Sequence, residues 1–495
     1  MARKDLLDIV SLDRQEIDRL LDQAAPFKEL FTRSVKKVPA LQGKSVLMLF
    51  YEPSTRTRTS FNTSMRELGG RYDGFSGTEG TAVMKSETVR DTVAMMCANH
   101  FDVLVMRHPR DGTLQWAADC SGVPVINGGD GKNEHPTQAM LDVLTLYVLN
   151  QGKLDGLRVG FGGDLSHGRT VRSLSLALSH FEGVTIRWAA EDFLGIPEEL
   201  AVLLAERGVR VERDPTVRDV MRQVDFYYMT RPQLERMPGI TKEDILAMIE
   251  QYRIDLGKVA GFDAKVLHPL PVNSEIAEID YRVYFTPAQA FFRQAEFGIF
   301  LRKALLHEML RHDGYVVYDG RLPAELAVGN NRLARPLGET KRRSMFIDRI
   351  TRGTVIDHLA EGSLRAVNEA LDLEHRGCSC TTAVIAEKRN PFLKTDLAEL
   401  GERDLKRVAL LSPEPTINTI AGSRLREKYV YLLCRNENCV TRVVAEDVPP
   451  RFWNDRGTIR CRYCRRPYTV TSRKVEPADL AAYLAALPTA IEPVR

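Results

Sequence analysis

Residues 45–61 read SVLMLFYEPSTRTRTSF, and this stretch indicates the fold more strongly than any other part of the chain. Its first six residues are almost continuously apolar, as expected of a strand that is buried on both faces of a parallel sheet. A turn rich in hydroxyls and arginines follows, and it leads into an amphipathic segment with Phe61 and Met65 on one helical face. A strand that passes through a polar turn into a helix is the repeating unit of parallel α/β sheets.

The same strand-to-helix alternation continues to about residue 310. Further apolar runs of strand length lie at 102–107, 123–128, 157–163, 184–190, 224–230 and 264–270. They form two blocks, and we therefore predict an α/β protein with two doubly wound parallel-sheet domains, at 1–150 and 151–289. A helix expected at 290–311 completes the first of them.

The second part of the chain has a different character. Residues 312–343 are basic, weakly periodic and interrupted by glycine and proline, which is typical of a linker. Mixed strand and helix patterns then predict an α+β domain at 344–427. A small β domain that carries four cysteines is expected at 428–480.

The composition agrees with a globular protein of several domains. The chain has 495 residues, 44% of them hydrophobic and 27% charged, and its formal net charge of +3 is too small to indicate a partner. Its start lacks the apolar core of a signal peptide, and no window approaches ~18 uninterrupted apolar residues. We expect a cytoplasmic protein that does not bind membranes.

The polar turn after the first strand has the residue types of an anion site. Ser54, Thr55, Arg56 and Thr57 stand where free backbone N–H groups and the positive end of a helix dipole favour negative charge. Arginine adds a planar fork that matches phosphate. The alternative is an ordinary helix cap beside a solvated arginine pair, which would not need so many donors.

Arginines also follow three other predicted strands, at Arg107, Arg169 and Arg231. Ligands of open α/β sheets bind at the carboxyl ends of the strands. The sequence has neither a Walker A loop nor a dinucleotide fingerprint, and no convincing nucleophile–base pair. This pattern predicts a site that holds two anionic small molecules and acts by positioning and electrostatics.

Four cysteines near the end of the chain have the spacing of a metal site. Cys434 and Cys439 are separated by four residues, and Cys461 and Cys464 by two. Two short loops with two thiolates each suit tetrahedral zinc without an open position, so we predict one structural zinc per chain. The surrounding arginines leave nucleic-acid binding as an alternative, disfavoured because few aromatic residues accompany them. The pair Cys378 and Cys380 lacks partners at ligand spacing.

Six motifs, in this order and spacing, resemble the catalytic chain of the aspartate carbamoyltransferases: STRTR, MRHP, HPTQ, GDLxxGRT, MTRxQ and HPLP. The resemblance covers about residues 1–310. The related ornithine carbamoyltransferases share STRTR but typically read HPCQ and HCLP, where this chain has Thr137 and Pro269. The resemblance implies transfer of the carbamoyl group of carbamoyl phosphate to L-aspartate, in pyrimidine (UMP) biosynthesis, without a catalytic cofactor.

The resemblance also implies roles for individual residues. Those that would bind carbamoyl phosphate are Ser54, Thr55, Arg56, Thr57, Thr81, Lys85, Arg107, His135, Gln138, Leu270 and Pro271. Those that would bind aspartate are Lys85, Arg169, Arg231 and Gln233. The catalytic set would be Arg56, Thr57, Lys85, Arg107 and His135.

One of these residues would act on a neighbouring subunit. Residues 81–88 resemble the family's mobile loop, whose lysine, here Lys85, reaches the neighbour's site. The resemblance thus implies a homo-oligomer built from trimers with shared active sites. The alternative for Lys85 is a solvated surface lysine. A departure from the family is Val272, where an arginine is usual, and it puts a contact between the domains in doubt.

The stretches 352–358, RGTVIDH, and 410–420, LLSPEPTINTI, resemble the family's separate regulatory chain. That chain binds ATP or CTP, and the candidate effector contacts here are Asp357, His358 and Lys394. The segment from Asn418 to Cys434 is shorter than in better-known regulatory chains, so a domain kept only for assembly is the alternative.

Two other functions remain open at this point. The acceptor could be ornithine or another amino acid, or the chain could be a nucleotide- or nucleic-acid-binding regulator with an inactive transferase half. The first is disfavoured by two arginines suited to a dicarboxylate acceptor. The second is disfavoured because the motif residues are intact apart from Thr81, where the family has serine, and Val272.

Overall fold

The structure is a computed structural model. It describes residues 5–310 except 33–35, 234–236, 238 and 240, then 332–334, and 352–489 with gaps at 358, 361–362, 374–375, 377–379, 386–389, 396–399, 413–414, 422–423, 469–476 and 488. The chain divides into two compact units. The first comprises Met1–Glu87, Thr92–Pro109 and Ser121–Tyr318, and the second comprises Thr88–Asp91, Arg110–Cys120 and Asp319–Arg495.

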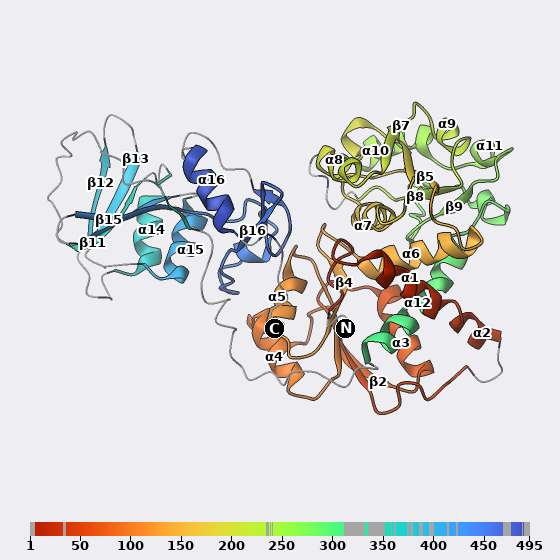
Figure 1. The fold of residues 1–495 in the computed structure, drawn as a ribbon, viewed down its shortest axis with the longest axis horizontal. Coiled ribbons are helices and arrows are strands. Elements are labelled where there is room, and N and C mark those ends of the chain that lie inside the picture. Colours follow the sequence, from red (N-terminus) through yellow and green to blue (C-terminus); the bar gives the residue numbers. More distant parts are fainter. Residues whose placement is uncertain are drawn as a thin grey trace. The chain divides into compact units, whose positions relative to one another are not determined.

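A four-stranded parallel sheet with the order β2-β1-β3-β4 forms the first lobe of the first unit (Figure 1). Its strands are β1 (Ser45–Phe50), β2 (Arg71–Ser76), β3 (Val103–His108) and β4 (Val125–Asp130). Every residue of the central strand β1 is buried, as its apolar sequence predicts.

A five-stranded parallel sheet with the order β7-β6-β5-β8-β9 forms the second lobe. Its strands are β5 (Arg158–Gly162), β6 (Thr185–Ala189), β7 (Arg210–Arg213), β8 (Phe226–Met229) and β9 (Lys265–Leu267). In both sheets non-consecutive neighbours are joined by crossovers, the topology of a doubly wound fold.

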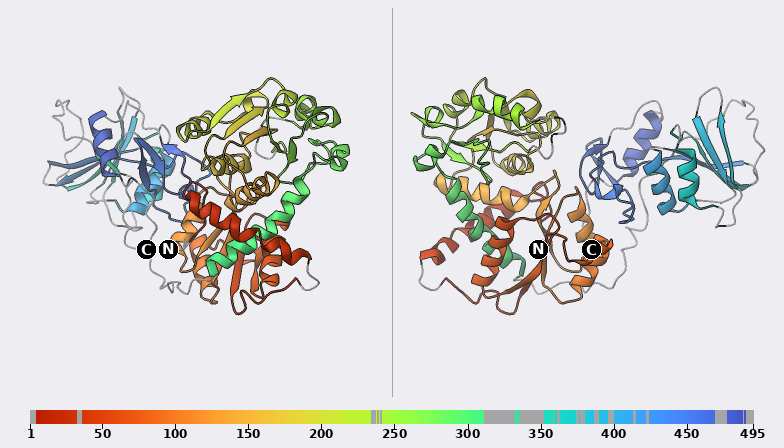
Figure 2. Two further views of the ribbon diagram at one scale, coloured as in Figure 1. Left: turned by 45° about the vertical axis from the view of Figure 1, so that its right-hand side comes forward. Right: turned by 180° about the vertical axis from the view of Figure 1, so that it is seen from behind.

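Helices precede, connect and follow these strands along the chain. They are α1 (Arg14–Ala24), α2 (Phe27–Thr32), α3 (Thr55–Glu67), α4 (Val89–Cys97), α5 (Thr113–Cys120), α6 (Pro136–Leu149), α7 (Arg169–Leu178), α8 (Glu198–Glu206), α9 (Val217–Met221), α10 (Lys242–Tyr252), α11 (Leu256–Val259) and α12 (Phe291–Leu310). Single 3-10 turns occur at η1 (Ala82–Lys85), η2 (Asp192–Leu194) and η4 (Tyr281–Phe285). The late helix α12 returns to the first lobe and packs against α1, α3 and α6, as the views in Figure 2 also show. It therefore completes the core of that lobe.

The second unit contains a six-stranded antiparallel sheet with the order β10-β15-β14-β11-β13-β12. Its strands are β10 (Arg332–Ala334), β11 (Arg352–Asp357), β12 (Cys380–Ile385), β13 (Asn390–Thr395), β14 (Thr416–Ala421) and β15 (Arg424–Tyr431). Two helices pack against each other beside it, α14 (Leu364–Leu371) and α15 (Glu402–Leu411). Buried leucines of both helices share one core with the sheet.

A second, smaller antiparallel sheet follows, with the order β16-β17-β18. Its strands are β16 (Phe452–Asp455), β17 (Thr458–Cys461) and β18 (Pro467–Tyr468), preceded by the turn η5 (Val440–Arg442) and followed by helix α16 (Pro477–Ala486). The buried Lys406 of α15 donates to the Val443 carbonyl at 2.9 Å and so joins the larger sheet's helices to this region.

The predicted fold class is confirmed: two parallel-sheet α/β lobes are followed by an antiparallel α+β region and a small cysteine-bearing β region. The edge strands β2 and β7 were not predicted. Most of the expected linker 312–343 lies outside the described residues, and its described part, Arg332–Ala334, is strand β10. Among the described helices, none is long and apolar enough to cross a membrane.

Candidate functional site

A pocket with a volume of about 510 Å³ opens in the first unit. Residues of both lobes line it, and most of them follow the carboxyl ends of strands, where parallel sheets bind ligands. The predicted site residues in its lining are Ser54, Thr55, Arg56, Thr57, Arg107, His135, Gln138, Arg169, Arg231, Gln233, Leu270 and Pro271. The structure therefore brings together residues from six separate sequence motifs.

Three helices begin at this pocket. Their N-cap residues are Ser54 for α3, His135 for α6 and Gly168 for α7, and none of the three caps its helix through a side-chain hydrogen bond. The first backbone N–H groups of each helix are thus left without a side-chain acceptor from the cap. Three positive helix ends that meet at one pocket favour an anionic ligand.

Five arginines add charge to the same pocket: Arg56, Arg107, Arg169, Arg231 and Arg302. Arg56 donates from Nη2 to the Leu270 carbonyl at 2.9 Å, and its pKa is lowered by burial and by the nearby Arg231. Arg169 donates from Nη1 to the Gly131 carbonyl at 2.7 Å. So many guanidiniums in one pocket repel one another, and anionic ligands would relieve that repulsion.

The backbone beside two of these arginines has to be glycine. Gly129 has a φ of +130°, and an added Cβ would lie 2.9 Å from Nη1 of Arg107 and 3.2 Å from Cζ of Arg169. A side chain there would be strained and would displace both guanidiniums. The glycine at the carboxyl end of β4 therefore makes room for the arginines.

The structure adds one charged residue that the sequence motifs did not single out. Glu52 accepts hydrogen bonds from Nη2 of Arg107 and from Nη2 of Arg169, the latter at 3.2 Å. Burial opposes ionisation of Glu52, but Arg169 and Arg107 outweigh it and lower the pKa of this carboxyl. Glu52 thus links an arginine of the first lobe to one of the second.

His135 is held as a neutral imidazole. It is buried, and burial together with Arg169, Arg107 and Arg302 lowers its pKa well below the ordinary value. The hydroxyl of Thr137 lies 3.4 Å from Nδ1, so a tautomer with its proton on Nε2 satisfies both groups. Such a ring can donate one hydrogen bond to a ligand without carrying a charge.

The remaining predicted residues are placed as follows. The backbone N–H of Gln233 donates to Asp164 at 3.1 Å, which fixes the turn after β8. Thr81 precedes η1 and Lys85 ends it, and neither belongs to the pocket lining. Val272 packs against the hydrophobic core.

The effector candidates lie in the second unit. Asp357 and Lys394 belong to strands β11 and β13, which pair with each other. His358 lies outside the described residues. The roles implied for these three residues stay predictions.

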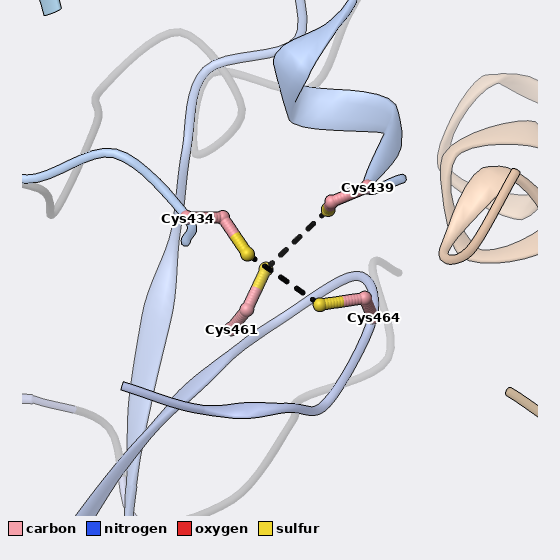
Figure 3. Close-up of side chains that lie close together, drawn as sticks. All are labelled: Cys434, Cys439, Cys461 and Cys464. Carbon is pink, nitrogen blue, oxygen red and sulfur yellow. Dashed lines mark hydrogen bonds between the residues drawn. The ribbon is translucent and has the colours of Figure 1, made fainter. Parts of the chain in front are cut away.

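The four cysteines of the predicted metal site do come together in the fold. Cys434, Cys439, Cys461 and Cys464 are all buried, and their sulfurs lie within 4.8 Å of one another. Figure 3 shows the four side chains pointing toward a common centre from separate turns. A buried four-sulfur cluster of this kind has the chemistry of a metal-binding site. Cys380 begins β12, and Cys378 lies outside the described residues.

Four protein-family models match most of the chain. Residues 4–148 match the carbamoyl-P binding domain of aspartate/ornithine carbamoyltransferase, and residues 155–309 match its Asp/Orn binding domain. Residues 345–431 match the allosteric domain of the aspartate carbamoyltransferase regulatory chain, and residues 428–473 match its metal binding domain.

Curated relatives agree over the first part of the chain. The aspartate carbamoyltransferase catalytic subunit of Parabacteroides distasonis is 38% identical over 311 residues, which is 63% of this chain and 98% of the relative. That of Chromobacterium violaceum is 41% identical over 312 residues, 63% of this chain and 99% of the relative.

Solved structures give the same match. The catalytic subunit of M. jannaschii aspartate transcarbamoylase is 35% identical with a TM-score of 0.58, over 62% of this chain and 98% of that one. The Trypanosoma cruzi aspartate transcarbamoylase, solved with carbamoyl phosphate and aspartate, is 32% identical with a TM-score of 0.56, over 62% and 95%.

Proposed function

Because the chain belongs to the aspartate carbamoyltransferase family, with catalytic and regulatory parts in one polypeptide, we propose that its pocket transfers the carbamoyl group of carbamoyl phosphate to L-aspartate. The observation that carries this proposal is the convergence of five arginines and three helix N-termini on one pocket. That arrangement suits two anions held side by side.

Carbamoyl phosphate would bind at the start of α3. Its phosphate would accept hydrogen bonds from the free N–H groups there, from the hydroxyls of Ser54, Thr55 and Thr57, and from Arg56 and Arg107. Arg107 is almost fully buried, so its charge is screened little by water. The carbamoyl group would then point toward His135 and Gln138.

Charge develops on the carbamoyl oxygen during the reaction. Thr57, Arg107 and the neutral His135 are the donors suited to that oxygen, because each can offer an N–H or O–H at the same end of the pocket. Donors that are fixed before the reaction stabilise the oxyanion without reorganising.

Aspartate would be held through its two carboxylates by Arg169, Arg231 and Gln233. Its amine attacks the carbamoyl carbon, the new C–N bond forms, and the C–O bond to phosphate breaks. The amine's surplus proton passes to the departing phosphate, which is itself a base. The nucleophile belongs to the substrate, so the chain supplies position and charge.

A product assay tests the acceptor. With carbamoyl phosphate we expect N-carbamoyl-aspartate from L-aspartate, and a kcat/KM for ornithine lower by a factor of at least about 10³, since ornithine brings an ammonium group instead of a second carboxylate to a pocket lined by arginines. Colorimetric detection of the ureido group, followed by chromatography, separates carbamoyl-aspartate from citrulline. Citrulline as the main product would overturn the proposal.

We also propose that the active site is shared between subunits of a trimer, with Thr81 and Lys85 serving the neighbouring subunit's pocket. In support, both lie outside the lining of their own pocket, and Lys85 is exposed at the end of η1. A cation at that position could complete a neighbour's anion site.

Mixing two inactive variants tests the sharing. Arg56→Ala and Lys85→Ala are each expected to be nearly inactive, but a mixture dissociated and reassembled at equal amounts should recover about a quarter of wild-type activity, because a quarter of the sites then combine two intact halves. The matched control pairs Arg56→Ala with His135→Ala, two residues of the same half, and should recover nothing. Equal recovery in both mixtures would contradict a shared site.

We propose zinc as the metal of the four-cysteine centre. In a tetrahedral zinc site with Zn–S bonds of ~2.3 Å the sulfurs lie about 3.8 Å apart. Here Cys434 and Cys464 are 3.5 Å apart at their sulfurs, and Cys439 and Cys461 are 3.9 Å apart. Four thiolates leave no ligand position for water, which supports a structural role.

For the regulatory sheet we propose binding of a nucleotide such as ATP or CTP, with Asp357, His358 and Lys394 as candidate contacts. The match of residues 345–431 to an allosteric domain supports an effector. The choice of ATP or CTP comes from the resemblance to the family's regulatory chain, and we propose a cytoplasmic location from the sequence features described above.

A further inference from the structure

A buried carboxylate lies directly behind the pocket, on the helix that carries Gln138. Asp142 of α6 is fully inaccessible to solvent, and it stands one helical turn after Gln138 on the same face. Nothing in the reaction described above uses this residue. A fully buried carboxylate is costly unless its hydrogen bonds serve a purpose.

Three side chains from three elements donate to this carboxylate. Gln138 of α6 and Gln294 of α12 donate from Nε2 to Oδ1 at 3.0 and 2.6 Å, and Tyr228 of β8 donates from its hydroxyl to Oδ2 at 2.9 Å. Burial raises the pKa of Asp142 to about 7, against the three donors and the charge of Arg302. Arg302 is itself buried and supplies a compensating positive charge.

The chemistry of the partners fixes which way each glutamine amide faces. The backbone N–H of His268 can only donate, and it lies 2.9 Å from the side-chain oxygen of Gln294. The nitrogen of Gln294 therefore faces Asp142 and donates to Oδ1. Gln138 donates from its own nitrogen to the same oxygen, and its oxygen is left for the pocket that it lines.

The hydrogen-bond network of Asp142 also extends to the Leu270 carbonyl, which is a second hydrogen-bond acceptor at the pocket. Nδ1 of His268 accepts from the backbone N–H of Leu270 at 2.8 Å, and Nε2 lies 3.1 Å from Glu278. The chain Asp142–Gln294–His268 thus fixes the turn that presents the Leu270 carbonyl, which Arg56 already contacts. Asp142 is therefore the common anchor of two hydrogen-bond acceptors.

We propose that Asp142 is a positioning residue that makes the pocket specific for an amino-bearing acyl phosphate: it turns the oxygen of Gln138 toward the ligand and, through Gln294 and His268, holds the Leu270 carbonyl beside it. The proposal rests on the proposed function, since the carbamoyl NH2 is the group with two N–H donors for these two oxygens. Without Asp142 the Gln138 amide would be free to rotate, and it would present its own N–H groups to the carbamoyl NH2 as often as its oxygen.

Comparing the binding of acetyl phosphate with that of carbamoyl phosphate distinguishes this positioning role from general structural support. It has a methyl group where carbamoyl phosphate has NH2, so it uses the same phosphate and carbonyl donors but neither acceptor. We expect Asp142→Leu to weaken carbamoyl phosphate binding by a factor of ~10 to 100, about what the loss of oriented acceptors costs, and to change acetyl phosphate binding less than about threefold. Both affinities are measured by calorimetry with the full-length protein.

Two further variants complete the experiment. Asp142→Asn keeps an oxygen for the two glutamines and can donate to Tyr228, so carbamoyl phosphate should bind within about threefold of wild type. If Asp142→Leu fails to fold, as circular dichroism and gel filtration would reveal, Gln294→Leu breaks the next link and should show the same selective loss, by about three- to tenfold.

Equal weakening of both acyl phosphates in the leucine variants, no weakening of either, or a loss in Asp142→Asn as large as in Asp142→Leu would overturn the proposal. The activity of the unaltered protein is a separate check. If it makes no carbamoyl-aspartate, the proposed function fails, whereas the ratio of the two affinities still decides whether Asp142 orients the acceptors.

Discussion

Replacing Arg56 by alanine is expected to lower kcat/KM by about 10²- to 10⁴-fold, which is the range found when an oriented donor to developing charge is removed. Arg56 lies in the first turn of α3, lines the pocket and donates to the Leu270 carbonyl. Its loss removes a guanidinium from the proposed phosphate site and also frees the turn that carries Leu270. Steady-state kinetics with both substrates varied measures the effect.

The chain offers a matched control two residues away. Arg58 lies in the same helix, is not part of the pocket lining, and donates from Nη2 to the Gly74 carbonyl at 3.3 Å. Arg58→Ala should keep kcat/KM within about threefold, as expected of a side chain that never touches substrate. If both variants lost activity equally, the effect would come from damage to α3, and the phosphate assignment of Arg56 would be wrong.

The second large effect is expected at the metal centre. Cys461→Ser should reduce bound zinc from one per chain to nearly none and should unfold the small sheet, because structural zinc contributes about 10–16 kcal/mol to the folding of such domains. Cys461 is completely buried at the end of β17 and is one of the four cysteines of the cluster in Figure 3. Metal analysis by mass spectrometry and limited proteolysis of residues 434–468 report the two outcomes.

Catalytic activity should persist after the metal has been lost. The pocket belongs entirely to the first unit, so Cys461→Ser, or treatment with a chelator, should disturb the association of catalytic trimers with one another before it lowers turnover. Cys97→Ser removes a thiol outside the cluster and should keep one zinc per chain. Loss of turnover ahead of assembly would contradict a structural role for the metal.

The interior strands could be predicted from the sequence because burial on two faces demands continuous apolar runs. The run 45–50 became β1, and 224–230 contains β8. The strands β2 and β7 were missed because each lies at a sheet edge and is mostly exposed, so that its residues, such as those of RYDGFS, carry no apolar signal. Pairing with a neighbour, which the sequence does not display, decides that they are strands.

The pocket residues that could be predicted are those that a short stretch of sequence is enough to identify. Arginines at or just past the ends of strands could be identified from the sequence, because parallel strands end at one edge of a sheet. The four arginines predicted in this way, Arg56, Arg107, Arg169 and Arg231, all line the pocket. Glu52 stands inside the quoted opening stretch, yet its importance depends on Arg107 and Arg169, which lie far along the chain.

The role of Asp142 could not be predicted from the sequence for a related reason. In the sequence it is one acidic residue in a helix, where a solvated surface position is the usual expectation. Only the approach of β8 and α12 buries it and surrounds it with donors. Long-range contacts of this kind cannot be read from the sequence alone.

Strand β10 has a consequence for how the two units operate together. Helix α12 ends at Leu310 in the first unit, and Arg332 pairs with Tyr431 in the larger antiparallel sheet, so the catalytic and regulatory parts belong to one polypeptide. A covalent connection keeps the two parts in the same molecule, whatever the concentration of the protein in solution. Dilution, which separates catalytic from regulatory subunits when they are independent chains, therefore cannot change their one-to-one ratio here.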